Sequence, residues 1–325
     1  MGLKETRNHS LDLLKFLLAY EVVMLHCNQG PVFISRPIVD SAVPCFFMIS
    51  GFFMHDVNEV RYDMRLKKAI RRIFVILCWS TILCGIDDIY RLCFHHEIGN
   101  LTWKVLWEFL FFNENPFAFH LWYIAAYLYV LVFCWLFHKI GVRVKQVWII
   151  ALWLLGIVIA VLYSQVYGKS IEYLYIRNFL FEGIPFFGIG FLLSQKVRWV
   201  GKIPLWGVVL TLATIIIMAI IVKSHEKYNN STFIFSGIIA FITLVFFLKI
   251  QMNEPNYLTK IGKEDGLYIY IFHPFVMNLL KSKYALSILG YNAYLFSTIV
   301  FVLTILGIRL YRKTTERFSF VPKLS

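Results

Sequence analysis

The amino-acid sequence predicts an all-α, polytopic membrane protein with about ten transmembrane helices. Of its 325 residues, 59% are hydrophobic and only 16% are charged, and the mean hydropathy is +0.67. A soluble domain carries roughly 25% charged residues, so this composition excludes a soluble enzyme and a disordered chain. Apolar stretches recur about every 32 residues, which accommodates a spanning helix of ~20 residues and a short loop each time.

Ten apolar stretches are expected to span the bilayer. They lie near residues 11–28, 38–55, 71–90, 118–138, 147–166, 179–195, 204–222, 232–249, 266–281 and 292–311. The third and the ninth are the weakest, since Asp87 and Asp88 are expected to end the third span and two lysines the ninth. The segment 101–112 is short and rich in Trp, which predicts a helix lying in the membrane interface. With no internal repeat or linker, residues 1–325 are expected to form a single domain.

The distribution of lysine and arginine predicts which side of the membrane each loop faces. With the N-terminus inside, 22 of the 32 basic residues lie in segments assigned to the cytoplasm and nine in the opposite loops. This positive-inside bias predicts that both termini are cytoplasmic. The net charge of +13 is then explained by membrane orientation, so no nucleic-acid partner is expected. The six cysteines form no CxxC pair, so no disulfide framework and no metal site is expected.

The first span carries ionisable side chains, which are costly inside a bilayer and need a reason. Lys15 and His26 are eleven residues apart, which places them within about 20° of each other around a helix. The rise between them is about 16.5 Å, so a cation toward the cytoplasm and an imidazole toward the outer side share one stripe. Asp12 precedes Lys15 by three residues and can pair with it. Alternatively, Lys15 extends to the inner interface and His26 is a hydrogen-bonded residue at the helix end.

A cluster of basic residues follows the second span. It consists of Arg61, Arg65, Lys68 and Arg72, with Arg71 beside them. The spacing of four, three and four residues places the first four on one helical face at the cytoplasmic surface. Such a face anchors the topology and binds anionic lipid at about 1 kcal/mol per basic residue. It can equally bind the phosphates of a ligand, and both interpretations stay open.

Further polar residues are expected to converge with His26. They are His120, Trp122, Arg177, Asn178 and Glu182 near the outer ends of their spans, and His273 within the ninth span. The first two can instead belong to an interfacial aromatic belt. Asn178 and Glu182, four apart on one expected helix face, can form a structural cluster with the neighbouring arginine. His273, with Pro274 behind it, can line a site or pair with freed backbone groups.

Six ordered blocks of the sequence resemble acyltransferase family 3, a family of integral membrane proteins. The blocks are HSLDLLKFLLAYEVVMLHCN (9–28), VPCFFMISGFF (43–53), RLKKAIRRI (65–73), HLWYIAAY (120–127), RNFLFEGIPFFGIG (177–190) and YIYIFHPF (268–275). The signature of that family is Arg or Lys, ten residues, then His, which Lys15 and His26 match. Lys15 stands where Arg is commoner, and Glu21 is an acidic residue that the pattern does not place.

The resemblance implies a reaction. Such proteins take an acyl group, acetyl in the simplest case, from cytoplasmic acyl-CoA and place it on an extracytoplasmic hydroxyl, often of a glycan. Acyl transfer to an alcohol needs a base near the hydroxyl, and His26 is the natural base on the acceptor side. Glu182 is expected to orient that imidazole, as a carboxylate supports a catalytic histidine. No permanently bound cofactor is expected, and the location implied is a bacterial cell (inner) membrane.

The resemblance also implies ligand contacts. Lys15 is expected to hold an anionic part of CoA, and the basic motif to hold its phosphates through Arg65, Lys68, Arg71 and Arg72. The acceptor is expected to contact His120, Trp122, Arg177, Asn178 and His273.

A transporter without catalysis is the alternative function. The blocks AVPCFFMISG (42–51), HLWY (120–123) and RNFLFEGIPFF (177–187) are also similar to the membrane module of vancomycin-resistance serine racemases. That module belongs to the same family, and amino-acid transport is ascribed to it. Consumption of acyl-CoA discriminates between the two functions. A purely structural scaffold would not explain the shared face of Lys15 and His26.

Overall fold

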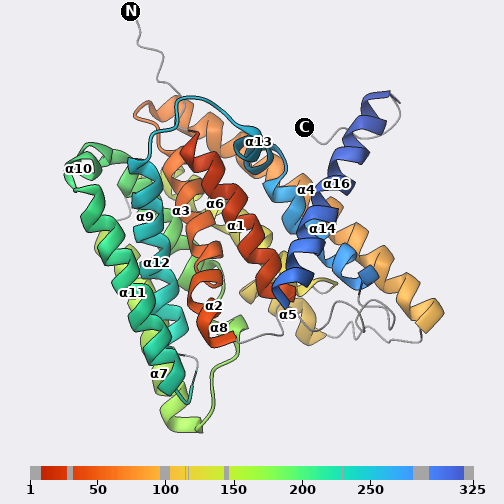
Figure 1. Ribbon diagram of the computed structural model, residues 1–325, viewed down its shortest axis with the longest axis horizontal. Helices are drawn as coiled ribbons and strands as arrows, with labels where there is room; N and C mark the ends of the chain where they lie inside the picture. Colours follow the sequence, from red (N-terminus) through yellow and green to blue (C-terminus); the bar gives the residue numbers. More distant parts are fainter. Residues whose placement is uncertain are drawn as a thin grey trace, which may run out of the picture. The chain divides into compact units, whose positions relative to one another are not determined.

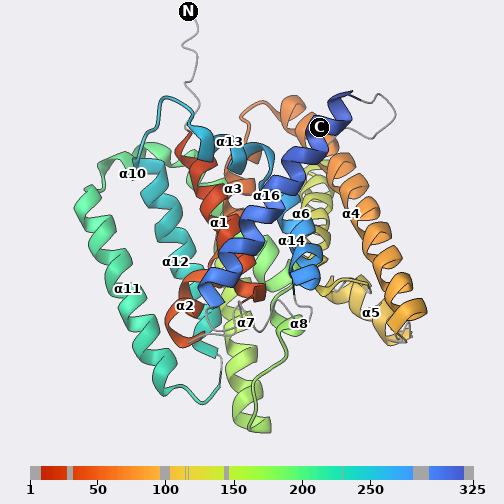
Figure 2. The same ribbon diagram turned by 45° about the vertical axis from the view of Figure 1, so that its right-hand side comes forward.

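The computed structural model confirms the all-α class (Figures 1 and 2). It describes residues 9–27, 32–95, 103–113, 115, 117–142, 146–228, 230–280 and 293–317. Within these residues every regular element is a helix and none is a strand.

The chain divides into two compact units, each assembled from separate segments. The first unit comprises Met1–Phe46, Val200–His225 and Phe235–Ser325, and the second comprises Phe47–Trp199 and Glu226–Ile234. The expectation of a single domain over residues 1–325 stays a prediction.

The first unit is built around the N-terminal helix. Its helices are α1 (Ser10–Cys27), α2 (Val32–Val39), the first turn of α3 (Ala42–Met54), α11 (Leu205–His225), most of α12 (Asn230–Lys249), α13 (Tyr257–Glu264), α14 (Gly266–Leu280) and α16 (Ala293–Arg317). Helix α1 packs against α13, α14 and α16, which lie beside it in both ribbon views. Small and branched side chains, among them Ala19, Val23, Ile269 and Val300, are fully buried between these helices. This packing is what positions the residues of the α1 stripe.

Three segments of the first unit gather at one of its ends. The backbone N–H of His9 donates to the carbonyl oxygen of Met252, 3.1 Å away, which ties the start of α1 to the loop before α13. The guanidinium of Arg312, late in α16, donates to the carbonyl oxygen of Glu264 at 2.7 Å. The start of α1, the short helix α13 and the last turns of α16 therefore lie together, which agrees with a common side for both termini. That this end of the unit faces the cytoplasm stays a prediction.

The second unit contains the remaining helices. They are the rest of α3, α4 (Glu59–His95), α5 (Trp103–Phe112), the 3-10 turn η1 (Phe119–Leu121), α6 (Trp122–Lys139), α7 (Gln146–Tyr167), α8 (Tyr173–Ile176), the π-helical turn η2 (Phe179–Gly183), α9 (Ile184–Gln195) and the start of α10 (Val197–Lys202). Helix α4 packs on α6, and α7 packs on α9 and η2.

Two glycines allow α3 and α9 to touch through their backbones in the second unit. A Cβ atom on Gly51 would overlap the carbonyl oxygen of Phe187, and one on Gly190 would overlap that of Met48. Small residues at such crossings let membrane helices approach closely and gain dispersion contacts. Both contacts therefore depend on the absence of a side chain.

Membrane-spanning helices agree in place with the predicted spans. Within the described residues, seven helices are long and apolar enough to cross a bilayer: Arg36–Met54, Glu59–Asp87, Phe119–Lys139, Gln146–Tyr167, Leu205–His225, Asn230–Lys249 and Tyr294–Thr314. Two shorter apolar helices, Phe179–Gln195 and Gly266–Leu280, occupy the sixth and ninth predicted positions. The chain is a multi-pass membrane protein. Helix α1 coincides with the first predicted span but contains three charged residues, and it is not among the seven helices above. The count of ten spans therefore stays a prediction.

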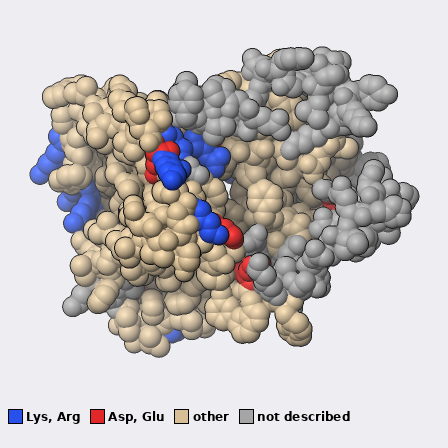
Figure 3. All heavy atoms as spheres, turned by 90° about the horizontal axis from the view of Figure 1, so that it is seen from below, with Lys and Arg blue, Asp and Glu red and all other residues tan. Residues whose placement is uncertain are grey.

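The charge distribution on the surface fits this class. In Figure 3, most of the described surface belongs to residues other than Lys, Arg, Asp and Glu. Many large apolar side chains face outward, such as Leu210 on α11 and Val158 on α7, at 60% and 50% exposure. In a bilayer these faces contact lipid rather than water.

The third span ends where the two aspartates predict. It runs from Glu59 to Asp87, while the helix α4 itself continues beyond the span to His95. Its start at Glu59 lies well before the expected start near residue 71. The expected helix in 101–112 forms as α5, with Trp103 and Trp107 exposed. Its place in the membrane interface stays a prediction.

Candidate functional site

The predicted pair at the start of α1 is present. The Lys15 Nζ lies 3.3 Å from Oδ1 of Asp12, and the His9 Nδ1 lies 3.7 Å from Oδ2 of the same carboxylate. The Asp12 side chain is buried, with 1% exposure, whereas that of Lys15 is 24% exposed. A buried carboxylate is tolerated only with such partners. Lys15 therefore has a structural role toward Asp12 whatever else it binds.

His26, at the other end of α1, lies against a second histidine. Its ring centroid is 4.9 Å from that of His273 in α14, with the planes inclined by 58°. The sequence analysis expected His273 among several residues near His26, but it did not predict direct contact of the two rings. The packing of α1 on α14 brings them together within the first unit.

Hydrogen bonds assign the tautomer of both imidazoles. The Nδ1 of His26 lies 2.8 Å from the carbonyl oxygen of Val22, and the Nδ1 of His273 lies 3.0 Å from that of Ile269. A carbonyl oxygen only accepts, so each Nδ1 carries the hydrogen. In the neutral ring Nε2 is then the basic nitrogen. Each ring is therefore oriented by a hydrogen bond within its own helix.

His273 has a backbone partner, but not the one expected from the proline. Pro274 lacks an N–H and so frees the carbonyl of Tyr270, whereas the His273 Nδ1 donates to Ile269. His273 is fully buried, at 0% exposure. This bond is not to a group that the proline frees, and whether His273 lines a site stays a prediction.

Glu182 lies in an unusual turn of the second unit. The segment Phe179–Gly183 is π-helical rather than the start of an ordinary α-helix, so the predicted α-helical spacing of Asn178 and Glu182 is wrong here. The Asn178 side chain caps the turn by accepting from the N–H groups of Leu180 and Phe181. The Glu182 side chain is buried. Single π turns inside α-helices occur frequently at functional sites.

A residue that the sequence analysis missed supports the same turn. The Asn113 Oδ1 accepts from the N–H of Phe179 at 3.0 Å, and Asn113 itself is buried with a positive φ of 66°. Asparagine is among the few residues that tolerate this conformation. The available signal was the run Asn-Glu-Asn-Pro at 113–116, which is typical of a turn after a helix.

The remaining predicted acceptor residues lie in the same unit. His120 is in the 3-10 turn that leads into α6 and is only 5% exposed, so it does not face lipid as a belt residue would. Trp122 follows as the first residue of α6 and is half-buried. The Arg177 guanidinium lies over the Tyr173 ring, 4.4 Å from its centroid, in a cation–π contact.

The basic cluster forms the start of α4, as a helix. Arg61 and Arg65 each place a guanidinium nitrogen 3.2 Å from the Asp56 carboxylate. The pKa of Asp56 is held below its usual range, chiefly by the hydrogen bond from the Asn58 N–H and then by the two guanidiniums. Arg65 is thus engaged in holding the turn between α3 and α4.

The other three basic residues of the cluster remain available to a ligand. Lys68, Arg71 and Arg72 are exposed and form no ion pair with any described residue. They are the members of the cluster best suited to bind phosphates.

The comparison with known families covers all of these residues. The model of acyltransferase family 3, which is described as an acyltransferase domain, matches residues 8–310. The chain belongs to acyltransferase family 3. The match spans every predicted site residue, from Lys15 to His273, and confirms the resemblance seen in the six blocks.

A curated relative of this acyltransferase family 3 chain is the serine/alanine racemase of Enterococcus gallinarum. The two are 23% identical over 330 residues, which cover 91% of this chain and 45% of the relative. The chain thus spans less than half of the length of that relative. No solved structure matches the chain.

The structure of this family member divides its candidate residues between the two units. The first unit holds Lys15, His26 and His273, and brings the two histidines into contact. The second unit holds Arg65, Lys68, Arg71, Arg72, His120, Trp122, Arg177, Asn178 and Glu182. The expected contact between Glu182 and His26 would join the two units, and it stays a prediction.

Proposed function

We propose that this protein is a membrane O-acyltransferase. It moves an acyl group, acetyl in the simplest case, from cytoplasmic acyl-CoA to an extracytoplasmic hydroxyl of a glycan at the surface of a bacterial cell. The family to which the chain belongs supports acyl transfer. The observation that carries the proposal is the His26–His273 contact, in which each Nδ1 donates to a backbone carbonyl and Nε2 is the basic nitrogen of the neutral ring.

The proposed reaction uses His26 first as a base and then as an acid. Its Nε2 takes the proton of the acceptor hydroxyl as the oxygen attacks the thioester carbonyl. The tetrahedral intermediate collapses, the carbon–sulfur bond breaks, and the departing sulfur takes the proton from the imidazolium. The products are the ester and CoA with a free thiol. General base catalysis of this kind contributes about 10²–10⁴-fold.

His273 has a positioning role in this scheme. A second imidazolium beside the first would be repelled, so a proton taken up by His26 leaves His273 neutral. Its ring then packs against the imidazolium and limits the orientations of His26. Glu182 is proposed to support the same imidazole or the acceptor, and His120, Trp122, Arg177 and Asn178 to contact the acceptor.

Donor binding is assigned to the cytoplasmic side. Lys15 and the exposed residues Lys68, Arg71 and Arg72 are proposed to attract the anionic CoA, with Arg65 holding the turn from which α4 starts. Arg and Lys are the usual partners of phosphate groups.

Transport of a small amino acid is the second candidate function. It is favoured by the relative named serine/alanine racemase, because this chain aligns with 45% of that protein at 23% identity. In such a carrier, the two histidines would contact the transported amino acid without forming a covalent bond to it.

One experiment separates the two functions. The purified protein, in bilayer nanodiscs, is given acetyl-CoA labelled in the acetyl group together with surface glycans from a deletion strain. We expect labelled glycan and free CoA thiol in equal amounts, and a matching mass increment on glycans of the parent strain that the deletion strain lacks. Uptake of labelled serine or alanine into proteoliposomes, with no thiol released, would contradict the acyltransferase proposal.

A further inference from the structure

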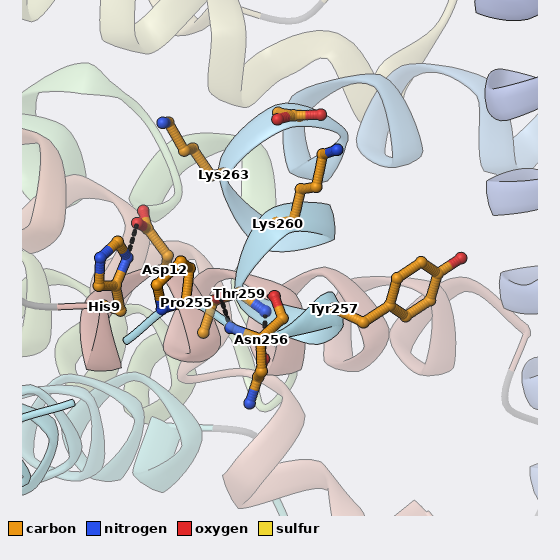
Figure 4. A pocket seen from close by; sticks show the side chains of 9 residues that line it. His9, Asp12, Pro255, Asn256, Tyr257, Thr259, Lys260 and Lys263 are labelled. Atoms are coloured by element: carbon orange, nitrogen blue, oxygen red, sulfur yellow. Dashed lines mark hydrogen bonds and ion pairs between the residues drawn. The ribbon is translucent and has the colours of Figure 1, made fainter. Parts of the chain in front are cut away.

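A pocket in the first unit lies where α1 begins. It is an open pocket bordered by the start of α1, the loop after α12 and helix α13, and has a volume of about 390 Å³. That size falls in the range of small-molecule sites. Figure 4 shows His9 and Asp12 on one side of it and Lys263 extending from α13 toward the same side, while the Tyr257 ring points away. None of the site residues predicted from the sequence lines this pocket.

The walls of the pocket are held by contacts that need no ligand. A Cβ atom on Gly262 would overlap the carbonyl oxygen of Asp12, so α13 rests directly on the backbone of α1. Asn256 and Thr259 form a reciprocal capping box that fixes the start of α13. At its end, the Arg309 guanidinium lies 2.7 Å from the Asp265 carboxylate. The pocket is therefore pre-formed.

The charges of the lining leave a surplus of positive charge. The Asp12 carboxylate is paired with Lys15 at 3.3 Å, and that of Glu264 with Arg312 at 3.4 Å. Both of these cations lie outside the lining. Lys260 and Lys263 line the pocket and form no ion pair with any described residue. Two ammonium groups thus remain for an anion, beside carboxylate and amide oxygens that can accept from hydroxyl or amino groups.

We propose that this pocket binds the nucleotide end of the acyl-CoA donor, with Lys260 and Lys263 on the ribose 3′-phosphate. The inference rests on the proposed function. The pocket lies at the end of α1 opposite His26, since the fourteen residues from Asp12 to His26 rise about 21 Å. The long linear pantetheine arm then runs along α1, past Lys15, with its thioester toward His26. A phosphate with adjacent hydroxyl and amino groups fits a pocket that offers both ammonium groups and acceptor oxygens.

The test compares CoA with 3′-dephospho-CoA, which differs only in that phosphate. Binding of each is measured by calorimetry to the full chain in phosphatidylcholine nanodiscs. The variants are Lys260→Ala, Lys263→Ala, the double variant, and Lys202→Ala as a control. Lys202 is an exposed lysine of α10 in the same unit and lies outside the pocket. Because it removes the same charge, it reports any effect of net charge alone.

We expect the parent protein to prefer CoA and each single variant to weaken CoA binding about tenfold, as for a lost charge-assisted hydrogen bond. The double variant should bind both ligands equally, Lys263→Arg should keep the preference, and Lys202→Ala should change neither affinity. An unchanged preference in the double variant, with acyl transfer intact, would overturn the pocket assignment and leave the proposed function standing. No CoA binding to the parent protein would instead remove the proposed function. If the double variant kept its CoA preference and lost binding to phosphatidylglycerol vesicles, the pocket would be a lipid-phosphate site and this assignment wrong.

Discussion

The imidazole of His26 in α1 and that of His273 in α14 are in contact, with 4.9 Å between ring centroids and the ring planes tilted by 58°. Both donate through Nδ1 to the carbonyl four residues earlier in their own helix. Two helices that are far apart in the sequence therefore bring two histidines together, and both rings have the same tautomer, with Nε2 as the basic nitrogen. The predictions below test what this arrangement and its surroundings do.

Replacement of His26 should abolish the chemical step and spare donor binding. His26→Ala is expected to lower acyl transfer by about 10²–10⁴-fold, the usual effect of losing a general base. His273→Ala removes a positioning contact, and we expect a loss of about tenfold in rate, which corresponds to about 1.4 kcal/mol in the activation barrier. Transfer rate and CoA affinity are measured on each folded variant. Near-normal transfer by His26→Ala would contradict the role of His26 as general base and favour the transport function.

Lys15 should have separable structural and donor-binding roles. Lys15→Ala leaves the buried Asp12 carboxylate without its nearest cation, at a cost of up to about 3 kcal/mol of stability. Adding Asp12→Asn should restore stability while acyl-CoA use stays weak. Lys15→Arg should keep both the stability of the protein and its use of acyl-CoA. Thermal unfolding and the KM for acyl-CoA are measured in parallel, and an unchanged KM in the double variant would exclude a donor role.

Glu182 should matter less for the rate than His26, and little for the fold. The π turn around it is capped by Asn178 and Asn113, so Glu182→Gln should retain the native unfolding temperature and lose less transfer activity than His26→Ala. Asn178→Ala is the matched structural variant and should lose about 1 kcal/mol of stability through the missing cap. A loss of transfer by Glu182→Gln as complete as that of His26→Ala would show a direct role in the reaction.

The glycine contact between α3 and α9 should be sensitive to a single methyl group. Gly51→Ala and Gly190→Ala each place a Cβ against a backbone carbonyl, and we expect a loss of about 1–3 kcal/mol in stability. Gly307→Ala, in α16, has no atom within 4 Å of the new Cβ and should be neutral or slightly stabilising. Unfolding in mild detergent compares the three. Equal behaviour of all three variants would show that the close approach is not important.

The sidedness of the chain can be tested by labelling single cysteines in a cysteine-free background. Position 225, at the exposed end of α11, should react with a membrane-impermeant maleimide in intact cells, whereas position 65 should react only after lysis. The basis is the excess of basic residues in the loops assigned to the cytoplasm. Labelling of position 65 and not 225 in intact cells would reverse the orientation.

Features that depend on local sequence were predictable. Most of the spans follow from hydropathy. The helical start of α4 and the Asp12–Lys15 pair follow from spacing within one helix, because their partners are only a few residues apart. The family was also recognisable, since six blocks keep their order along the chain. Asp87 was recognisable as the end of the third apolar span, although the helix α4 continues beyond it to His95.

Features that join distant segments were decided by the tertiary structure alone. Hydropathy identifies α1 and α14 as buried helices, but only their packing places His273 against His26. The pocket between α1 and α13 exists because Gly262 lets two backbones touch, and the π turn at Glu182 is capped by Asn113 from a separate segment. Periodicity records which face of a helix is apolar, whereas the choice of partner helix depends on the shapes of both surfaces. That choice is a property of the assembled helices, so it appears only when they are packed together.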